Sequence, residues 1–488
     1  MLVQVPMSLL RIKLPYLLFI IALATTVLVC YRPFFGSMNS SYDKLTESPF
    51  DKIIFVTIDT LRSDHLSDYG YPRETAPFLS SLIERGVMFE NAFTASSHTA
   101  PSHASIFTSL FPHQHNVLRN YDSLDPKLYN LSTALSAKGY EQAAITAVKF
   151  LEGNVGFPVL APELDLESAS FSRKTWYRNA QVNIDRAINW LTKKNNPDKF
   201  FLWLHFYDVH EWDNKKNLPK EYLHTFANEG NDQIVDFVSK QHNISEKFHG
   251  SRQKFKGALD RYDGRIRFVD DQLQRLYQHI QNFDSSKNTL WVITSDHGEG
   301  LGAHNYKDHG EFLYQEQLKV PLIFFSENTY IPTRRVSDLV RTIDIMPTLL
   351  SLSGAQAALQ EQKLAGLALT PLLQYGTWNS AGISYSLAER RPKDDTPLRR
   401  KWEDGNIFSL HDLSEKFIFH SQSAHEFYDL EKDPLEERNL GLAPTQLNQE
   451  FQSGVKNMQD FYKNEQSTPS EQKLNKDQYE ELKTLGYM

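Results

Sequence analysis

The sequence predicts an α/β protein built on a largely parallel β-sheet, followed by a smaller C-terminal α+β subdomain. Three observations support this prediction: short apolar runs flanked by turn residues, helical patterns between those runs, and acidic or imidazole side chains directly after three of them. Apolar runs without alternation are typical of strands buried on both faces of a parallel sheet. From about residue 380 the segments become shorter and more charged, which indicates the subdomain.

Four runs are predicted strands, and helical spacing predicts four helices between and around them. The strands are Ile53–Ile58, Phe200–Phe206, Leu290–Thr294 and Val320–Phe325, and the helices are Ala76–Arg85, Leu131–Lys138, Thr175–Lys193 and Gly257–Asn282. The charged residues of the last helix are expected to form its solvated face; they include Asp260, Asp263, Asp270 and Asp271.

The N-terminal region contains an uncharged apolar stretch. Residues 14–31 would span about 27 Å as a helix. We expect a transmembrane anchor there, after a cytoplasmic tail at 1–13 and before a polar tether at 32–50, with a cleaved signal peptide or a lipid anchor on Cys30 as alternatives. Each alternative predicts that the main domain (51–378) and the C-terminal subdomain and tail (379–488) lie outside the cytoplasm, in a periplasmic, extracellular or lumenal space.

Composition excludes several classes of chemistry. Cys30 is the single cysteine, so residues 31–488 offer no disulfide, thiolate ligand or cysteine nucleophile. Lys and Arg number 52 against 60 Asp and Glu, a formal net charge of −8. Because nucleic-acid binders usually carry a basic excess, no nucleic-acid partner is expected.

Chemistry-bearing side chains follow three of the predicted strands. Asp59 comes after the first strand, Asp208 and His210 after the second, which also contains His205, and Asp296 and His297 after the third. A lone acid at a strand end is commonly a turn or a helix cap. Because ligands of open α/β sheets bind beyond the carboxyl ends of the strands, three such clusters together predict a metal site.

A further candidate is Thr99, in the segment Ser97–Ser105 (SHTAPSHAS). The proline at 101 marks a helix start, where free N–H groups and the positive end of the helix dipole favour an anion. The alternative is that Thr99 is only a helix cap.

Several segments together resemble a known family. Thr99–Ser105 (TAPSHAS) is similar to the sulfatase signature C/S-x-P-S-R-x-S of the alkaline phosphatase superfamily. Further similar segments occur in family order, before and after this signature, along most of the chain after the tether, including TIDTLRSDHL, LWLHFYDVHEW, SDHGEGLGAHNYKDHGEF, TIDIMPTLLSLSG and EFYDLEKDPLEERNL. The resemblance implies an alkaline-phosphatase-like three-layer αβα sandwich for the main domain.

The signature departs from the family pattern at two positions. Sulfatases convert the signature Cys or Ser into formylglycine, but this chain has Thr99, and His103 replaces the arginine that normally helps to hold the hydrated aldehyde. The resemblance therefore implies no formylglycine. It implies instead the route of the threonine-using relatives, in which a metal-bound Thr99 attacks phosphorus and forms a covalent phospho-threonine.

The same resemblance implies a metal-ligand set of Asp59, Asp296 and His297, with Thr99 as the reacting ligand. Calcium-type sulfatase sites have a second acid where this chain has Thr60, and an asparagine where it has His297. Losing a carboxylate and gaining an imidazole favours Zn²⁺ or Mn²⁺, with Ca²⁺ as the alternative, and one divalent ion is expected.

Other residues are expected to contact the substrate. His210 and His309 match positions that stabilise charge or protonate the leaving group, while His103, Lys149 and His304 are candidates for substrate binding. A structural, hydrogen-bonded role is the alternative for each histidine.

The leading hypothesis is an extracytoplasmic, metal-dependent hydrolase or phosphotransferase acting on phosphoesters, mono- or diesters of a small molecule, lipid or glycan headgroup. The alternatives are a sulfuric ester hydrolase without formylglycine and a non-catalytic glycan-binding protein. The polar segment at 211–256 is expected to be a variable insertion facing the substrate. The oligomeric state is left open.

Overall fold

The computed structural model describes residues 48–465 apart from 153–154, 156–176, 215–217, 228–230, 243, 245–247, 286, 379–381, 384, 391–405 and 442–446. The predicted anchor at 14–31, with the flanking segments 1–13 and 32–47, lies outside the described residues. Within the described part, we find no helix that combines the length and the apolar character needed to cross a membrane. No single N-terminal anchor is therefore shown, and the predicted localisation, which depended on one, is corrected on this point.

The main sheet contains seven strands in the described part of the chain, in the order β3-β4-β1-β5-β6-β2-β7. The strands are β1 Lys52–Ile58, β2 Val87–Phe93, β3 Glu141–Ile145, β4 Phe200–Phe206, β5 Thr289–Thr294, β6 Lys319–Ser326 and β7 Arg334–Arg341. Among them only β6 runs antiparallel to its neighbours, β5 and β2. The prediction of a largely parallel sheet is confirmed, and the four predicted strands correspond to β1, β4, β5 and β6.

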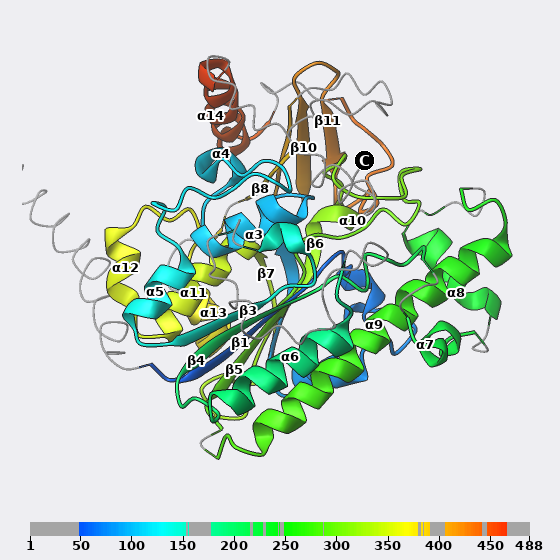
Figure 1. The fold of residues 1–488 in the computed structure, drawn as a ribbon. Helices are drawn as coiled ribbons and strands as arrows, with labels where there is room; N and C mark the ends of the chain where they lie inside the picture. Colours follow the sequence, from blue (N-terminus) through cyan, green and yellow to red (C-terminus); the bar gives the residue numbers. More distant parts are fainter. Residues whose placement is uncertain are drawn as a thin grey trace, which may run out of the picture. The chain divides into compact units, whose positions relative to one another are not determined.

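Helices cover both faces of this sheet, so the main domain has three layers (Figure 1). One face carries α3 Thr99–Thr108, α5 Leu131–Ala137, α11 Ile345–Leu352 and α13 Thr370–Tyr375, and the other carries α2 Pro77–Ile83, α6 Ala180–Lys193 and α9 Arg252–Gln281. Each face of the sheet has its own apolar core, and strand β1 contributes to both. Phe55 packs into the core that includes α3, while Ile54 and Val56 pack into the core that includes α9. Successive strand residues face opposite sides, so an all-apolar strand needs both layers.

The predicted solvated face of α9 is wrong for three of its four acids. Asp260, Asp263 and Asp270 are buried, because α2, α6, α7 and α8 pack around this helix. Each buried carboxylate has partners: Asp263 accepts from the Tyr71 hydroxyl at 2.9 Å, and Asp270 accepts from two backbone N–H groups at the start of α2. Buried charges need such partners, which the helical pattern alone does not reveal.

The C-terminal sheet is antiparallel, in the order β11-β10-β9-β8. Its strands are β8 Ser386–Arg390, β9 Ile407–His411, β10 Glu415–His420 and β11 Glu426–Asp429. Helix α14 Gln449–Glu465 packs on this sheet through Phe451 and Val455 (Figure 1). Another apolar cluster joins the sheet to the main domain, where Ile418 and Tyr428 meet Phe93 at the end of β2.

Short helices occupy the connections. They are α4 Pro112–His115, α7 Lys220–His224, α8 Asn231–Gln241, α10 Gln315–Leu318 and α12 Gln356–Glu361. Two of them, α7 and α8, lie in the predicted insertion at 211–256 and pack against α9.

Candidate active site

Four polar side chains meet where β1, β5 and α3 come together. Asp59 follows β1, Asp296 and His297 follow the neighbouring parallel strand β5, and Thr99 is the first residue of α3. The side chains of all four have no exposed surface. The sequence prediction named these four residues as a metal-ligand set, and the structure brings them together.

Distances within this cluster are short enough for a shared cation. His297 Nε2 lies 3.8 Å from Asp59 Oδ1 and 3.6 Å from Asp296 Oδ2. Those two carboxylate oxygens are buried and have no hydrogen-bond partner among the described residues. One ligand atom from each of the three residues lies within 4.8 Å of the other two.

Hydrogen bonds with backbone groups determine which atoms of Asp296 and His297 face the cluster. The backbone N–H groups of Thr60 and His297 donate to Asp296 Oδ1, at 3.3 and 2.9 Å, so Oδ2 is left for the cluster. The Nδ1–H of His297 donates to the Gly298 carbonyl at 2.9 Å, which places the lone pair on Nε2. A histidine oriented by a carbonyl in this way is typical of a metal ligand.

Burial and the proximity of Asp296 raise the pKa of Asp59 well above its ordinary value. Burial acts in the same direction on Asp296, but the nearby imidazoles, His297 foremost, hold the pKa of Asp296 below its ordinary value. Two buried carboxylates that converge are unfavourable unless a positive charge lies between them. The donor set therefore fits a divalent cation, and oxygen and imidazole ligands together suit Zn²⁺ or Mn²⁺.

Thr99 faces this cluster from the N-terminus of α3. Its Oγ1 lies 3.2 Å from His297 Nε2 and 3.5 Å from Asp59 Oδ2. The helix cap is His98, so Thr99 itself belongs to the first turn. Its hydroxyl is thus aimed at the cluster from the positive end of a helix dipole.

His103 lies behind Thr99, one turn along α3. Its Nδ1 contacts the Thr99 carbonyl at 2.7 Å and its Nε2 contacts Thr57 Oγ1 at 3.0 Å. The ring has no exposed surface, and burial lowers its pKa to about 3, so it is neutral. Both ring nitrogens are therefore occupied by the protein.

His205, near the end of β4, lies on the other side of the cluster. The Ala147 N–H points at its Nδ1 (3.3 Å), and its Nε2 lies 3.4 Å from Asp59 Oδ2. Burial lowers its pKa to about 4, so a neutral ring faces the carboxylate.

The two predicted catalytic histidines also lie at this site. The His309 ring stacks on His297 with centroids 4.4 Å apart, and His210 meets His309 edge to face at 4.9 Å. The Tyr207 hydroxyl lies 3.1 Å from His210 Nε2. The structure therefore adds two imidazoles beside the metal-ligand set.

Glu299 is a site residue that the sequence reasoning missed. Its Oε2 lies 3.4 Å from His309 Nδ1 and accepts from the Trp212 indole at 3.3 Å. Burial raises the pKa of Glu299 to about 7. The sequence feature that could have indicated Glu299 is its position between two glycines, two residues after His297.

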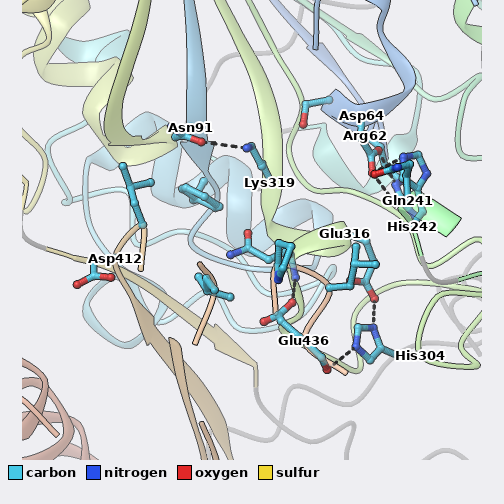
Figure 2. Close-up of a pocket in the computed structure, with 17 residues that line it drawn as sticks. Arg62, Asp64, Asn91, Gln241, His242, His304, Glu316, Lys319, Asp412 and Glu436 are labelled. Atoms are coloured by element: carbon cyan, nitrogen blue, oxygen red, sulfur yellow. Dashed lines mark hydrogen bonds and ion pairs between the residues drawn. The ribbon is translucent and has the colours of Figure 1, made fainter. Parts of the chain in front are cut away.

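The other two predicted substrate-binding residues have different surroundings. Lys149 is exposed at the start of a 3₁₀ turn beyond β3. His304 lines a separate cavity, where it contacts Glu316 Oε1 at 2.9 Å and the Glu436 carbonyl at 3.1 Å (Figure 2).

Two family models together match almost the whole described part of the chain. A family model described as Sulfatase matches residues 51–355, and one described as N-sulphoglucosamine sulphohydrolase, C-terminal, matches residues 302–465. A Delta 4,5-hexuronate-2-O-sulfatase of Bacteroides thetaiotaomicron is 22% identical over 441 residues, covering 79% of this chain and 84% of that protein.

Solved structures share the fold. A protein in complex with its substrate D-glucosamine-2-N,6-O-disulfate has a TM-score of 0.64 and 19% identity, covering 87% of this chain and 100% of its own. The phosphonate monoester hydrolase of Agrobacterium radiobacter has a TM-score of 0.62 and 19% identity, and the match covers 85% of this chain and 96% of that chain.

Proposed function

Because this chain belongs to the sulfatase family of the alkaline phosphatase superfamily, we propose that it is a metal-dependent ester hydrolase that uses Thr99 as its nucleophile and cleaves phosphoesters. The substrate would be a phosphate mono- or diester of a small molecule, lipid or glycan headgroup. Transfer to an acceptor hydroxyl in place of water would use the same first step.

The position of the Thr99 hydroxyl is the observation that supports this proposal. It points at the metal-ligand set, 3.2 Å from His297 Nε2. Threonine keeps a hydroxyl nucleophile but carries a methyl group, and the single cysteine of the chain is far away in sequence, at position 30. A direct attack by an alkoxide therefore replaces chemistry based on an aldehyde.

Asp59, Asp296 and His297 would hold the cation, which supplies positive charge to the nucleophile and to the ester oxygens when bound. Thr99 Oγ attacks phosphorus, the P–O bond to the leaving alcohol breaks, and that oxygen keeps the electron pair. Asp59 Oδ2, 3.5 Å from Thr99 Oγ1, accepts the hydroxyl proton. His309 protonates the leaving oxygen, and His210, whose pKa burial and His309 lower, packs against the His309 ring. Water then attacks the phospho-threonine and gives its proton to His309, the Thr99–phosphorus bond breaks, and Asp59 returns the proton to Thr99.

His103 would act in this reaction as a positioning residue. Since both ring nitrogens contact Thr57 and Thr99, it holds the first turn of α3 in place and does not reach the substrate.

A second candidate is a sulfuric ester hydrolase. This second function is favoured by the similarity to the Delta 4,5-hexuronate-2-O-sulfatase of Bacteroides thetaiotaomicron, which is a sulfatase. In that case Thr99 would form a sulfo-threonine in place of a phospho-threonine.

The two candidates are separated by turnover with the purified chain. We expect aryl phosphate mono- or diesters to be hydrolysed faster than an aryl sulfate in the presence of Mn²⁺ or Zn²⁺. Mass spectrometry of a quenched reaction should show one phosphoryl group on the peptide containing Thr99.

Thr99→Ala should lose this adduct and at least about a thousandfold in kcat, as expected when a nucleophile is removed. Thr99→Ser, which keeps the hydroxyl, is the matched control and should retain the adduct. Faster turnover of sulfate than of phosphate would favour the second candidate. A phosphoryl adduct that persists in Thr99→Ala would exclude Thr99 as nucleophile.

A further inference from the structure

A second group of possible metal ligands lies outside the catalytic cluster. Asp64 and His65 follow β1 in a short 3₁₀ turn, and His242 directly follows α8. One ligand atom from each lies within 4.8 Å of the other two. None of the three belongs to the proposed reaction.

The hydrogen bonds of His65 leave one of its nitrogens available. His65 Nδ1 contacts Asp263 Oδ1 at 2.9 Å, while Nε2 is fully buried and has no hydrogen-bond partner in the described part of the chain. A buried nitrogen without a partner is costly, and a cation would remove that cost. A carboxylate on the far nitrogen is also the usual support of a metal-binding histidine.

The spacing of the other two ligands fits a small cation. His242 Nε2 lies 3.3 Å from Asp64 Oδ2. Two ligands about 2 Å from a tetrahedral Zn²⁺ ion lie about 3.3 Å from each other. Two imidazoles and one carboxylate form a zinc-type donor set with a further position open to water.

Arg62 orients the carboxylate of this group. Its Nε donates to Asp64 Oδ1 at 2.9 Å, and its Nη2 donates to Oδ2 at 2.6 Å. Each carboxylate oxygen has two acceptor sites, so Oδ2 can accept from Arg62 and still bind a cation. The guanidinium also donates to the Glu299 carbonyl at 3.0 Å, which connects this group to the active-site loop.

A cavity of about 250 Å³ gives solvent access to the group. Asp64 and His242 line it, and Figure 2 shows them together with Arg62 and Gln241 at one side of the cavity. Four carboxylates line its wall (Asp64, Glu316, Asp412 and Glu436) against three cations: Arg62, Lys319 and His304, whose pKa the neighbouring Glu316 raises to about 9. This charge balance favours the approach of a cation.

We propose that Asp64, His65 and His242 form a second divalent-metal site of zinc type, separate from the catalytic cation. The ion connects the end of α8 to the segment after β1. Its role is structural: it fixes the predicted insertion, which contains α8, against the main domain.

Zinc stoichiometry tests this site with a readout other than turnover. The full chain is stripped with a chelator, reloaded with Zn²⁺, desalted and analysed for zinc per chain. We expect two ions in the wild type, one in the double variant Asp59→Asn/Asp296→Asn, and none when His242→Gln is added. His224→Gln, an exposed histidine on α7, is the matched control and should lose no ion.

Hydrogen exchange provides a second measurement that does not depend on the folding of the His242 variant. In the double variant, Zn²⁺ should slow the exchange of residues 231–242 and leave α14 unchanged. The proposal is overturned if the wild type and His242→Gln hold the same number of ions, or if the double variant binds no zinc and shows no slowing at 231–242. In either case Asp64 and His242 form only a side-chain contact that holds no ion.

Discussion

At the scale of single residues, His103 holds the first turn of α3 against β1 through both of its ring nitrogens. Its contacts with the Thr99 carbonyl and Thr57 Oγ1 determine where the Thr99 hydroxyl lies. Because catalysis depends on alignment of the attacking atom, a small displacement at this position is costly.

His103→Ala should therefore lower kcat by about 10- to 100-fold, since the first turn of α3 shifts while the metal ligands remain. KM and the metal content should stay close to wild type, which separates a positioning residue from one that binds substrate. The control is His279→Ala, near the C-terminal end of α9. A large rise in KM with unchanged kcat would contradict the positioning role.

The residues of the cluster differ in how far the sequence could predict them. Asp59, Asp296 and His297 were predictable, because side chains at the ends of parallel strands converge by topology. His304 was not, because the path of its loop decides which pocket it enters. Glu299 gave only a weak signal, since burial and the Trp212 contact depend on the folded insertion.

At the scale of elements, α2 depends on a carboxylate from another helix. Asp270 of α9 accepts from the N–H groups of Phe78 and Leu79 at 2.8 and 2.9 Å, while the cap residue Ala76 makes no side-chain bond. A distant side chain thus satisfies the free donors of the helix start.

Asp270→Ala should lower the free energy of unfolding by about 1–3 kcal/mol, because two buried N–H groups lose their acceptor. Urea unfolding followed by circular dichroism measures this change. Gln274→Ala, at an exposed position on the same helix, is the control and should change stability by less than about 0.5 kcal/mol. An equal effect of both substitutions would show that the contacts with α2 contribute little.

Elements with a continuous apolar pattern could be predicted from the sequence. Features that depend on contacts with residues remote in sequence could not. Strand β4 matches its prediction at both ends because all seven of its residues are buried. Strand β2 (VMFENAF) contains two polar residues, Glu90 and Asn91, which interrupt the pattern. The acids of α9 were misassigned because Arg73 and the start of α2, their partners, are remote in sequence.

At the scale of the whole molecule, His304 joins the loop between β5 and β6 to the C-terminal subdomain. Its ring contacts Glu316 Oε1 and the Glu436 carbonyl, and it stacks on Tyr314. Burial alone would lower its pKa, but Glu316 and the contacts with Glu436 raise the pKa of His304 to about 9.

A pKa raised in the folded state means that protonation of His304 stabilises the fold. This contribution is complete below the ordinary pKa of 6.5 and disappears as the pH rises through about 9. His304→Gln should therefore be less stable than wild type at pH 6, by up to about 3 kcal/mol, and the difference should shrink by pH 9.5. Thermal unfolding at several pH values measures this, and a difference independent of pH would contradict it.

The antiparallel direction of β6 has one more consequence. Because β5 and β6 run in opposite directions, residues 295–318 leave and return at the same edge of the sheet, forming one long hairpin connection. A hairpin loop closes locally, so its length can change with little entropic cost while the strand register stays fixed. The segment with Asp296, His297 and His309 is thus open to exchange with that of a relative with other substrate preferences, as long as the exchanged loop keeps the buried apolar residues Leu301 and Ala303 that pack into the core around α9.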